Sequence, residues 1–142
     1  MTSEATSLDD TSTRRVDASK TLWAGRALSG ITILFMLFDA AGKLALESHV
    51  IDATTQIGYP VAAIRPIGVI ALLCTILYAI PRTAVLGAVL LTGFFGGAMA
   101  SKIRVDAPLF SSILFAVYLG IIAWGGLYLR DERLRTLFPF RR

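Results

Sequence analysis

The stretch 83–101, TAVLGAVLLTGFFGGAMAS, contains no charged side chain and is long enough to cross a lipid bilayer. At ~1.5 Å of rise per residue, an α-helix of about 20 residues spans the ~30 Å hydrocarbon core. Three further stretches of similar length, 27–46, 61–80 and 107–129, carry only Asp39, Lys43 and Arg65 between them. The sequence therefore predicts an all-α, polytopic membrane protein built as a bundle of four transmembrane helices.

The composition agrees with a membrane protein. Charged residues make up 17% of the chain and hydrophobic residues 55%, whereas a soluble domain has about 25% charged residues. Spans near 26–46, 61–80, 83–101 and 107–129 leave no room for a second folded domain. We expect a disordered cytoplasmic tail at 1–21, because this segment is polar and lacks large apolar clusters. The membrane domain would occupy 22–138, with a basic C-terminal end at 139–142.

The basic residues are divided unequally between the two ends of the spans. Four of the 14 lysines and arginines, Lys43, Arg65, Lys102 and Arg104, fall at one end, and the other ten fall at the end that carries both termini. The positive-inside rule then places both termini in the cytoplasm. Basic residues that flank spans are suited to contacts with anionic lipid headgroups. The sequence therefore indicates that the positively charged residues bind the lipid bilayer and not nucleic acid.

A cysteine introduced in place of Ser3 tests this orientation. With the N-terminus in the cytoplasm, the new thiol should be shielded from an impermeant thiol reagent in intact cells and should react after permeabilisation. Labelling of intact cells would contradict the predicted orientation.

The few charges within or beside the spans are predicted to gather near the outer face. At ~1.5 Å per residue, Asp39 lies about 20 Å beyond Arg26, Lys43 lies about 26 Å beyond it, and Lys102 lies about 29 Å beyond Thr83. An ionised aspartate facing lipid would cost about 2.5–3.5 kcal/mol, so Asp39 should face the bundle interior. The residues expected at this depth or just outside it are Asp39, Lys43, Glu47, Lys102, Arg104, Ser111 and Ser112.

Two interpretations of these residues remain open. In the first, these residues form a polar pocket, open to the outside, for an anionic or quinone-like ligand. In the second, Asp39 and Lys43 form a structural ion pair that fixes the helix register. Arg65, Lys102 and Arg104 also suit contacts with lipid headgroups. The catalytic residues, if the chain is an enzyme, cannot be named from the sequence.

Small residues on the span 83–101 predict a helix contact. Gly93 and Gly97 have G-x-x-x-G spacing and Ser101 extends the row, which lets a neighbouring backbone approach closely.

The connection 47–60 is equally compatible with a plain loop and with a short interfacial helix that ends at Gly58. The helix is suggested by the helical spacing of Val50, Ile51, Thr54 and Ile57.

The motifs of redox and metal chemistry are missing from the sequence. The single cysteine, Cys74, cannot form a disulfide within the chain. No zinc-ligand spacing, P-loop or dinucleotide-binding glycine pattern is present. We therefore expect no metal site and identify no cofactor from the residues alone.

Several motifs resemble one family. The sequence reads FDAAGK at 38–43, QIGYP at 56–60 and YAIPRTAVLGAVLLTGFFGGAMA at 78–100, followed by LFSSILFAVYLG at 109–120 and WGGLYLRD at 124–131. Together these motifs resemble the DoxX-like family of small bacterial membrane proteins over roughly 22–138. Relatives often carry a histidine at the position of Lys102, so histidine-dependent chemistry does not transfer to this chain.

The resemblance implies a multi-pass protein of the bacterial cytoplasmic (inner) membrane. It also implies a membrane subunit of a quinone-linked or thiol-linked redox system, in which a quinone is the expected cofactor and a redox protein the expected partner. The alternative is a non-enzymatic scaffold or assembly subunit. A homo-oligomer is compatible with the sequence, and enzymatic activity is left undecided.

Overall fold

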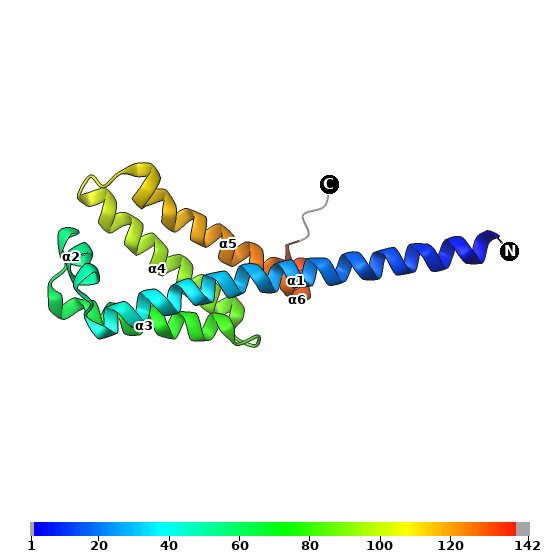
Figure 1. Ribbon diagram of the computed structural model, residues 1–142, viewed down its shortest axis with the longest axis horizontal. Coiled ribbons are helices and arrows are strands. Elements are labelled where there is room, and N and C mark those ends of the chain that lie inside the picture. The colour runs from blue at the N-terminus through cyan, green and yellow to red at the C-terminus, as the bar shows by residue number, and fades with distance from the viewer. Residues whose placement is uncertain (1, 139–142) are drawn as a thin grey trace.

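The computed structural model describes residues 2–138, with side chains from residue 7 onward, and is helical throughout most of this range (Figure 1). Four long helices, α1 (Thr2–Ala45), α3 (Val61–Ala79), α4 (Ala84–Arg104) and α5 (Leu114–Arg130), form the bundle. A π-helical turn, η1 (Leu109–Ile113), leads into α5, and two short helices, α2 (Ser48–Gln56) and α6 (Glu132–Leu137), lie at opposite ends. Four helical segments, in α1, in α3, in α4 and in η1 together with α5, are long and apolar enough to cross a membrane, which confirms the predicted four-helix fold.

The four helices run up and down in chain order around the bundle. Helix α1 contacts α3 and α5, and α4 contacts the same two helices. Within the described part of the chain, the backbones of the diagonal pairs, α1 with α4 and α3 with α5, do not approach each other closely. The Tyr78 side chain of α3 nevertheless reaches α5 and donates to the Ala123 carbonyl at 2.6 Å. Short connections favour antiparallel neighbours. The tightest connection is the turn at 80–83, where Pro81 ends α3 and the Thr83 amide donates to the Ile80 carbonyl at 3.1 Å.

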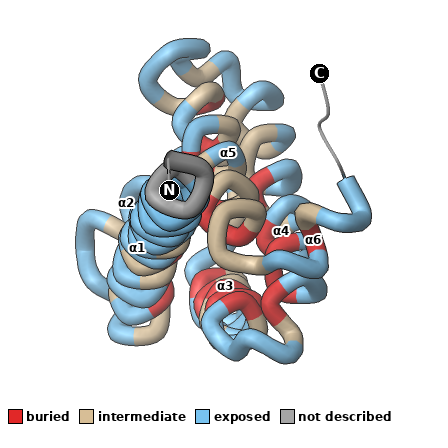
Figure 2. Tube along the Cα trace, turned by 90° about the vertical axis from the view of Figure 1, so that its right-hand side faces the viewer, coloured by how far each residue is buried: buried red, intermediate tan, exposed pale blue. Residues whose placement is uncertain are grey.

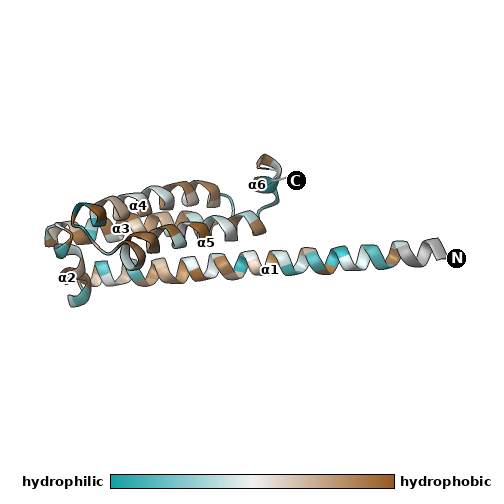
Figure 3. Cartoon of the chain, turned by 90° about the horizontal axis from the view of Figure 1, so that it is seen from above, coloured by the Kyte–Doolittle hydropathy of each residue, from teal (hydrophilic) through white to brown (hydrophobic). Residues whose placement is uncertain are grey.

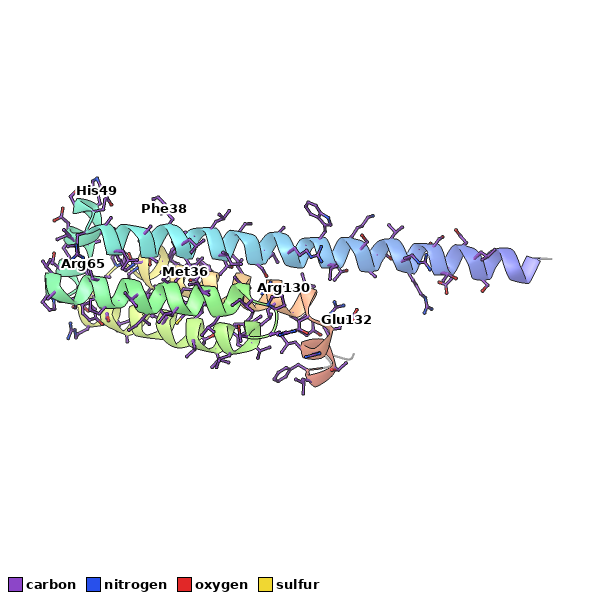
Figure 4. The ribbon with its side chains drawn as sticks, turned by 90° about the horizontal axis from the view of Figure 1, so that it is seen from below. Met36, Phe38, His49, Arg65, Arg130 and Glu132 are labelled. Atoms are coloured by element: carbon purple, nitrogen blue, oxygen red, sulfur yellow. The ribbon has the colours of Figure 1, made fainter. Side chains whose placement is uncertain are left out.

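The buried residues lie on the parts of the helices that face one another (Figure 2). Met36, Leu91 and Leu127 belong to the core. Hydrophobic residues are also common on the outward faces (Figure 3). Phe38 on α1 points away from the bundle (Figure 4), and 81% of its surface is exposed. An apolar exterior on all sides is the pattern of a helix bundle whose solvent is lipid.

Two glycines bring α1 and α5 into backbone contact. A Cβ added at Gly25 would lie 2.8 Å from the Arg130 amide nitrogen, and one at Gly126 would lie 2.8 Å from the Ser29 amide nitrogen. Gly87 on α4 lies even closer to the backbone of α3 at Tyr78. Small residues that permit such close approach are the usual way helices pack in a membrane.

The structure corrects the predicted packing row on α4. Among the described residues, a Cβ at Gly93 or Gly97 would meet nothing within 4 Å, and both glycines are exposed, so they form no helix contact there. The Ser101 hydroxyl donates to the Gly97 carbonyl of its own helix at 2.9 Å. The spacing of small residues indicates a shallow helix face, but it does not say whether another helix or an open cavity lies against that face.

The segment expected as a disordered tail is helical as far as it is described. Residues 2–21 continue α1 without interruption and project beyond the bundle (Figures 1 and 3). No proline or glycine occurs before Gly25, so the helix that starts in the bundle propagates outward without a new nucleation step. Contacts within this exposed part of α1 include the ion pair between Arg14 and Asp10 at 3.2 Å. The predicted basic C-terminal end, 139–142, lies outside the described residues.

The connection between α1 and α3 contains the short helix α2, which decides between the two readings of 47–60. Gly58 follows α2 with φ of +92°, a conformation that glycine adopts without strain. The Arg104 guanidinium donates to the Ile57 carbonyl at 3.1 Å and so joins the end of α4 to this connection.

Candidate functional site

A cavity of about 410 Å³ lies in the half of the bundle that carries α2. Its walls come from α1, the α2 segment, α3, α4 and α5, so residues distant in sequence meet there. Cavities of about 300–1,000 Å³ are typical of small-molecule sites. Gly93 and Gly97 form part of the wall. Their missing side chains provide space in the cavity, which explains why no neighbouring helix lies against them.

The charged part of the wall comes from α1. Asp39 and Lys43 form an ion pair, as their i, i+4 spacing predicts, and both line the cavity. The Asp39 side chain is 29% exposed to solvent and the Lys43 side chain is 14% exposed, so Lys43 is the more buried of the two. The pair therefore lies on the inner face of the first span.

Lys102 adds a second cation from α4. Its ammonium group donates to the Ser112 carbonyl at 3.1 Å, and its side chain lines the cavity. Ser112 belongs to the π-helical turn η1, where the backbone hydrogen bonds are one residue longer than in an α-helix. Such turns free or reorient carbonyl groups and often occur at functional sites. The sequence does not predict this turn.

Tyr59 and Ser101 complete the polar end of the cavity. Their hydroxyl groups are 2.7 Å apart and form a hydrogen bond between the connection after α2 and helix α4. Both residues line the cavity. From sequence, Tyr59 suits an interfacial aromatic belt, and nothing in its local pattern indicates an inward-facing hydroxyl.

The remaining wall is aromatic and aliphatic. Phe35 of α1 and Phe115 of α5 meet edge to face, with ring centroids 5.3 Å apart. Phe94 and Phe95 of α4 also contribute to the wall. Sequence reasoning missed these four rings, because phenylalanines are equally expected facing lipid. The sequence feature that could have identified them is that they lie at similar depth on three different spans.

The other predicted site residues do not line the cavity. Glu47 is exposed and precedes α2, with its carbonyl accepting from the Ile51 amide at 3.0 Å. Arg104 and Ser111 are exposed, and Ser112 takes part only through its backbone carbonyl. Arg65 and His49 lie at the same end of the molecule and also outside the wall (Figure 4). The predicted charge cluster therefore divides into a cavity-lining group and a surface group.

Cys74 is separate from this site. It is buried in the core and is not part of the cavity wall. Burial in apolar surroundings makes a thiol chemically inert.

Comparison with known families agrees with the fold. The family model described as the DoxX-like family matches residues 27–126. The chain belongs to the DoxX-like family. The DoxX-like match extends from the apolar part of α1 to most of α5, and it includes the residues that line the cavity. Neither the curated proteins nor the solved structures gave a match. The family and the four apolar helices together make this a multi-pass membrane protein.

Proposed function

We propose that the cavity binds the head group of a membrane quinone and that the protein is a membrane subunit of a quinone-linked redox system. The observation that carries this proposal is the combination of a cavity of about 410 Å³, aromatic walls and a cationic polar end in one bundle of apolar helices. In this proposal the protein lies in the bacterial cytoplasmic membrane, with both termini in the cytoplasm.

The residues present fit a quinone ring. The ring is flat and apolar on both faces, which suits packing against the side chains of Phe35, Phe94 and Phe115. Its two carbonyl oxygens accept hydrogen bonds, and Lys43, Lys102 and Tyr59 carry donors at one end of the cavity. Because the outside of the bundle is apolar, an isoprenoid tail would be accommodated by lipid.

A quinone-linked role is favoured over a thiol-linked one. The only thiol of the chain, Cys74, is buried away from the cavity. A bound quinone would supply the electron-accepting chemistry, while the chain would hold and orient it and exclude water. The electrons would come from a redox protein partner.

A scaffold or assembly subunit is the second candidate. One observation favours it: Asp39 and Lys43 are paired with each other within one helix, so their charges need no ligand. On this view the ion pair stabilises the orientation of α1, and the cavity is filled by lipid.

Replacing Lys102 with methionine separates the two candidates. The change keeps the length of the side chain but removes its charged donor. If the ammonium binds a quinone oxygen, the affinity for a short-chain benzoquinone should fall about tenfold, in line with a hydrogen bond to a charged group. Affinity would be measured by titration of the purified protein in detergent.

Arg65→Met is the matched control. It removes a cation at the same end of the bundle from an exposed residue outside the cavity wall, so quinone affinity should not change. Thermal melting of both variants would show whether the Ser112 carbonyl, left without its lysine partner, weakens the fold. Equal quinone affinity in the wild type and in Lys102→Met, with both folded, would leave the scaffold as the better explanation.

A further inference from the structure

A second cavity, also of about 410 Å³, lies at the opposite end of the bundle and is lined by four arginines. Arg26 comes from α1, Arg82 from the turn between α3 and α4, Arg130 from the end of α5, and Arg133 from α6. Four segments of the chain therefore converge to place positive charge around one cavity. Figure 4 labels Arg130 where the extension of α1 leaves the bundle.

The arginines around this cavity lack a matching set of acids. Within the described residues, none of the four forms an ion pair. The one carboxylate in the wall is Asp131, which accepts from the Arg133 amide at 2.9 Å and caps α6. The neighbouring Glu132 is exposed and lies outside the wall. The cavity therefore keeps a net positive charge.

Arg130 is held in place by the core. Its guanidinium donates to the Tyr78 carbonyl at 2.8 Å and lies over the Tyr78 ring at 5.1 Å from the centroid. The Tyr78 hydroxyl donates in turn to the Ala123 carbonyl at 2.6 Å. Arg130 thus has a fixed position, and with respect to the described residues most of its five donors are unused.

The other three arginines are available for a ligand. Arg26, Arg82 and Arg133 are exposed, and no side-chain hydrogen bond or ion pair engages them in the part of the chain that the structure describes. Arg26 directly precedes the apolar stretch 27–46 of α1, and Arg82 and Arg133 follow the ends of α3 and α5. The ends of apolar stretches are at the level of lipid headgroups in a bilayer. An ordered ligand here would therefore be anionic and accessible from the headgroup region.

We propose that this cavity is a binding site for a phosphate group. Arginine forks bind phosphate oxygens through paired, charge-assisted hydrogen bonds, and several arginines can share one phosphate. Basic pockets between transmembrane helices bind anionic lipid headgroups in this way. The phosphate belongs either to an anionic lipid or to a small soluble phosphate compound. The site is independent of the quinone proposal, because no residue is shared between the two cavities.

The test compares the wild-type protein with Arg26→Gln/Arg82→Gln. These positions are chosen because they are exposed, whereas Arg130 supports the fold. In one arm, native mass spectrometry follows binding of phosphatidylglycerol, with phosphatidylcholine as the zwitterionic reference of zero net charge. In the other arm, thermal melting is followed with inorganic phosphate against chloride at equal ionic strength. Each lost arginine should weaken binding roughly fivefold, so the double variant should bind about 25-fold more weakly.

Arg15→Gln/Lys20→Gln is the matched control, because it removes two positive charges from the exposed extension of α1. A loss of phosphatidylglycerol binding confined to the cavity variant would support a lipid site. A loss of stabilisation by inorganic phosphate confined to it would support a soluble phosphate compound. Equal losses in both double variants, or no preference of the wild type for either phosphate probe, would overturn the proposal.

Discussion

Gly126→Leu should strongly destabilise the bundle, because it forces a side chain between two helix backbones that are in contact. The Cβ alone would lie 2.8 Å from the Ser29 amide nitrogen and 3.1 Å from the Gly25 carbonyl oxygen, and both are backbone atoms of α1. Backbone cannot rotate away as a side chain can, so α1 and α5 would have to separate. Overpacking typically costs about 1–3 kcal/mol, and we expect a loss at or above about 3 kcal/mol for this variant.

Gly97→Leu is the matched control, because it makes the same change on a glycine with no neighbour within 4 Å of its missing Cβ. Its side chain would enter the first cavity, so the protein should remain folded and lose quinone binding. The measurement is thermal unfolding in detergent for both variants, together with quinone titration of Gly97→Leu. Similar melting temperatures for the wild type and Gly126→Leu would show that the α1–α5 contact is not as close as the structure has it.

These two glycines also show what the sequence could and could not predict. The four spans follow from length and the absence of charge, which are properties of each segment alone. The partner of a small-residue face depends on how helices are arranged in space, and the spacing of Gly93, Gly97 and Ser101 is the same for a helix contact and for a cavity wall. The close contact between α1 and α5 uses Gly25 and Gly126, which belong to different helices, and no pattern within one helix identifies it.

The candidate site was predictable to a similar degree. Asp39 and Lys43 were expected on one inward face from their spacing and from the cost of charge in lipid, and the structure has them there. Lys102 was expected at the same depth, yet its bond to Ser112 requires the π-helical turn before α5. Tyr59 and the phenylalanine rings were missed, because an aromatic residue suits lipid, an interface or a cavity equally well.

A double-mutant cycle on Asp39 and Lys43 is the prediction that bears most directly on function. Asp39→Leu leaves the Lys43 ammonium without its partner in a mostly buried position, and Lys43→Met does the same to the carboxylate. Breaking a buried pair costs about 3–5 kcal/mol, and the lower end applies to this pair because both side chains keep some exposure. The double variant Asp39→Leu/Lys43→Met should recover most of this stability, since no unpaired charge remains.

The exposed pair of Asp10 and Arg14 provides a control with the same i, i+4 spacing. These side chains are 65% and 80% exposed, so removing either should cost at most about 0.5 kcal/mol. The two interpretations of the inner pair differ in a second measurement, quinone affinity. If Lys43 donates to the ligand, the double variant should melt like the wild type and bind a short-chain benzoquinone about tenfold more weakly. If the pair only fixes helix register, stability and affinity should both recover, and Lys43 would have no part in the site. Stability alone cannot distinguish these cases, because an ion pair that orients a ligand and one that orients a helix cost the same to break.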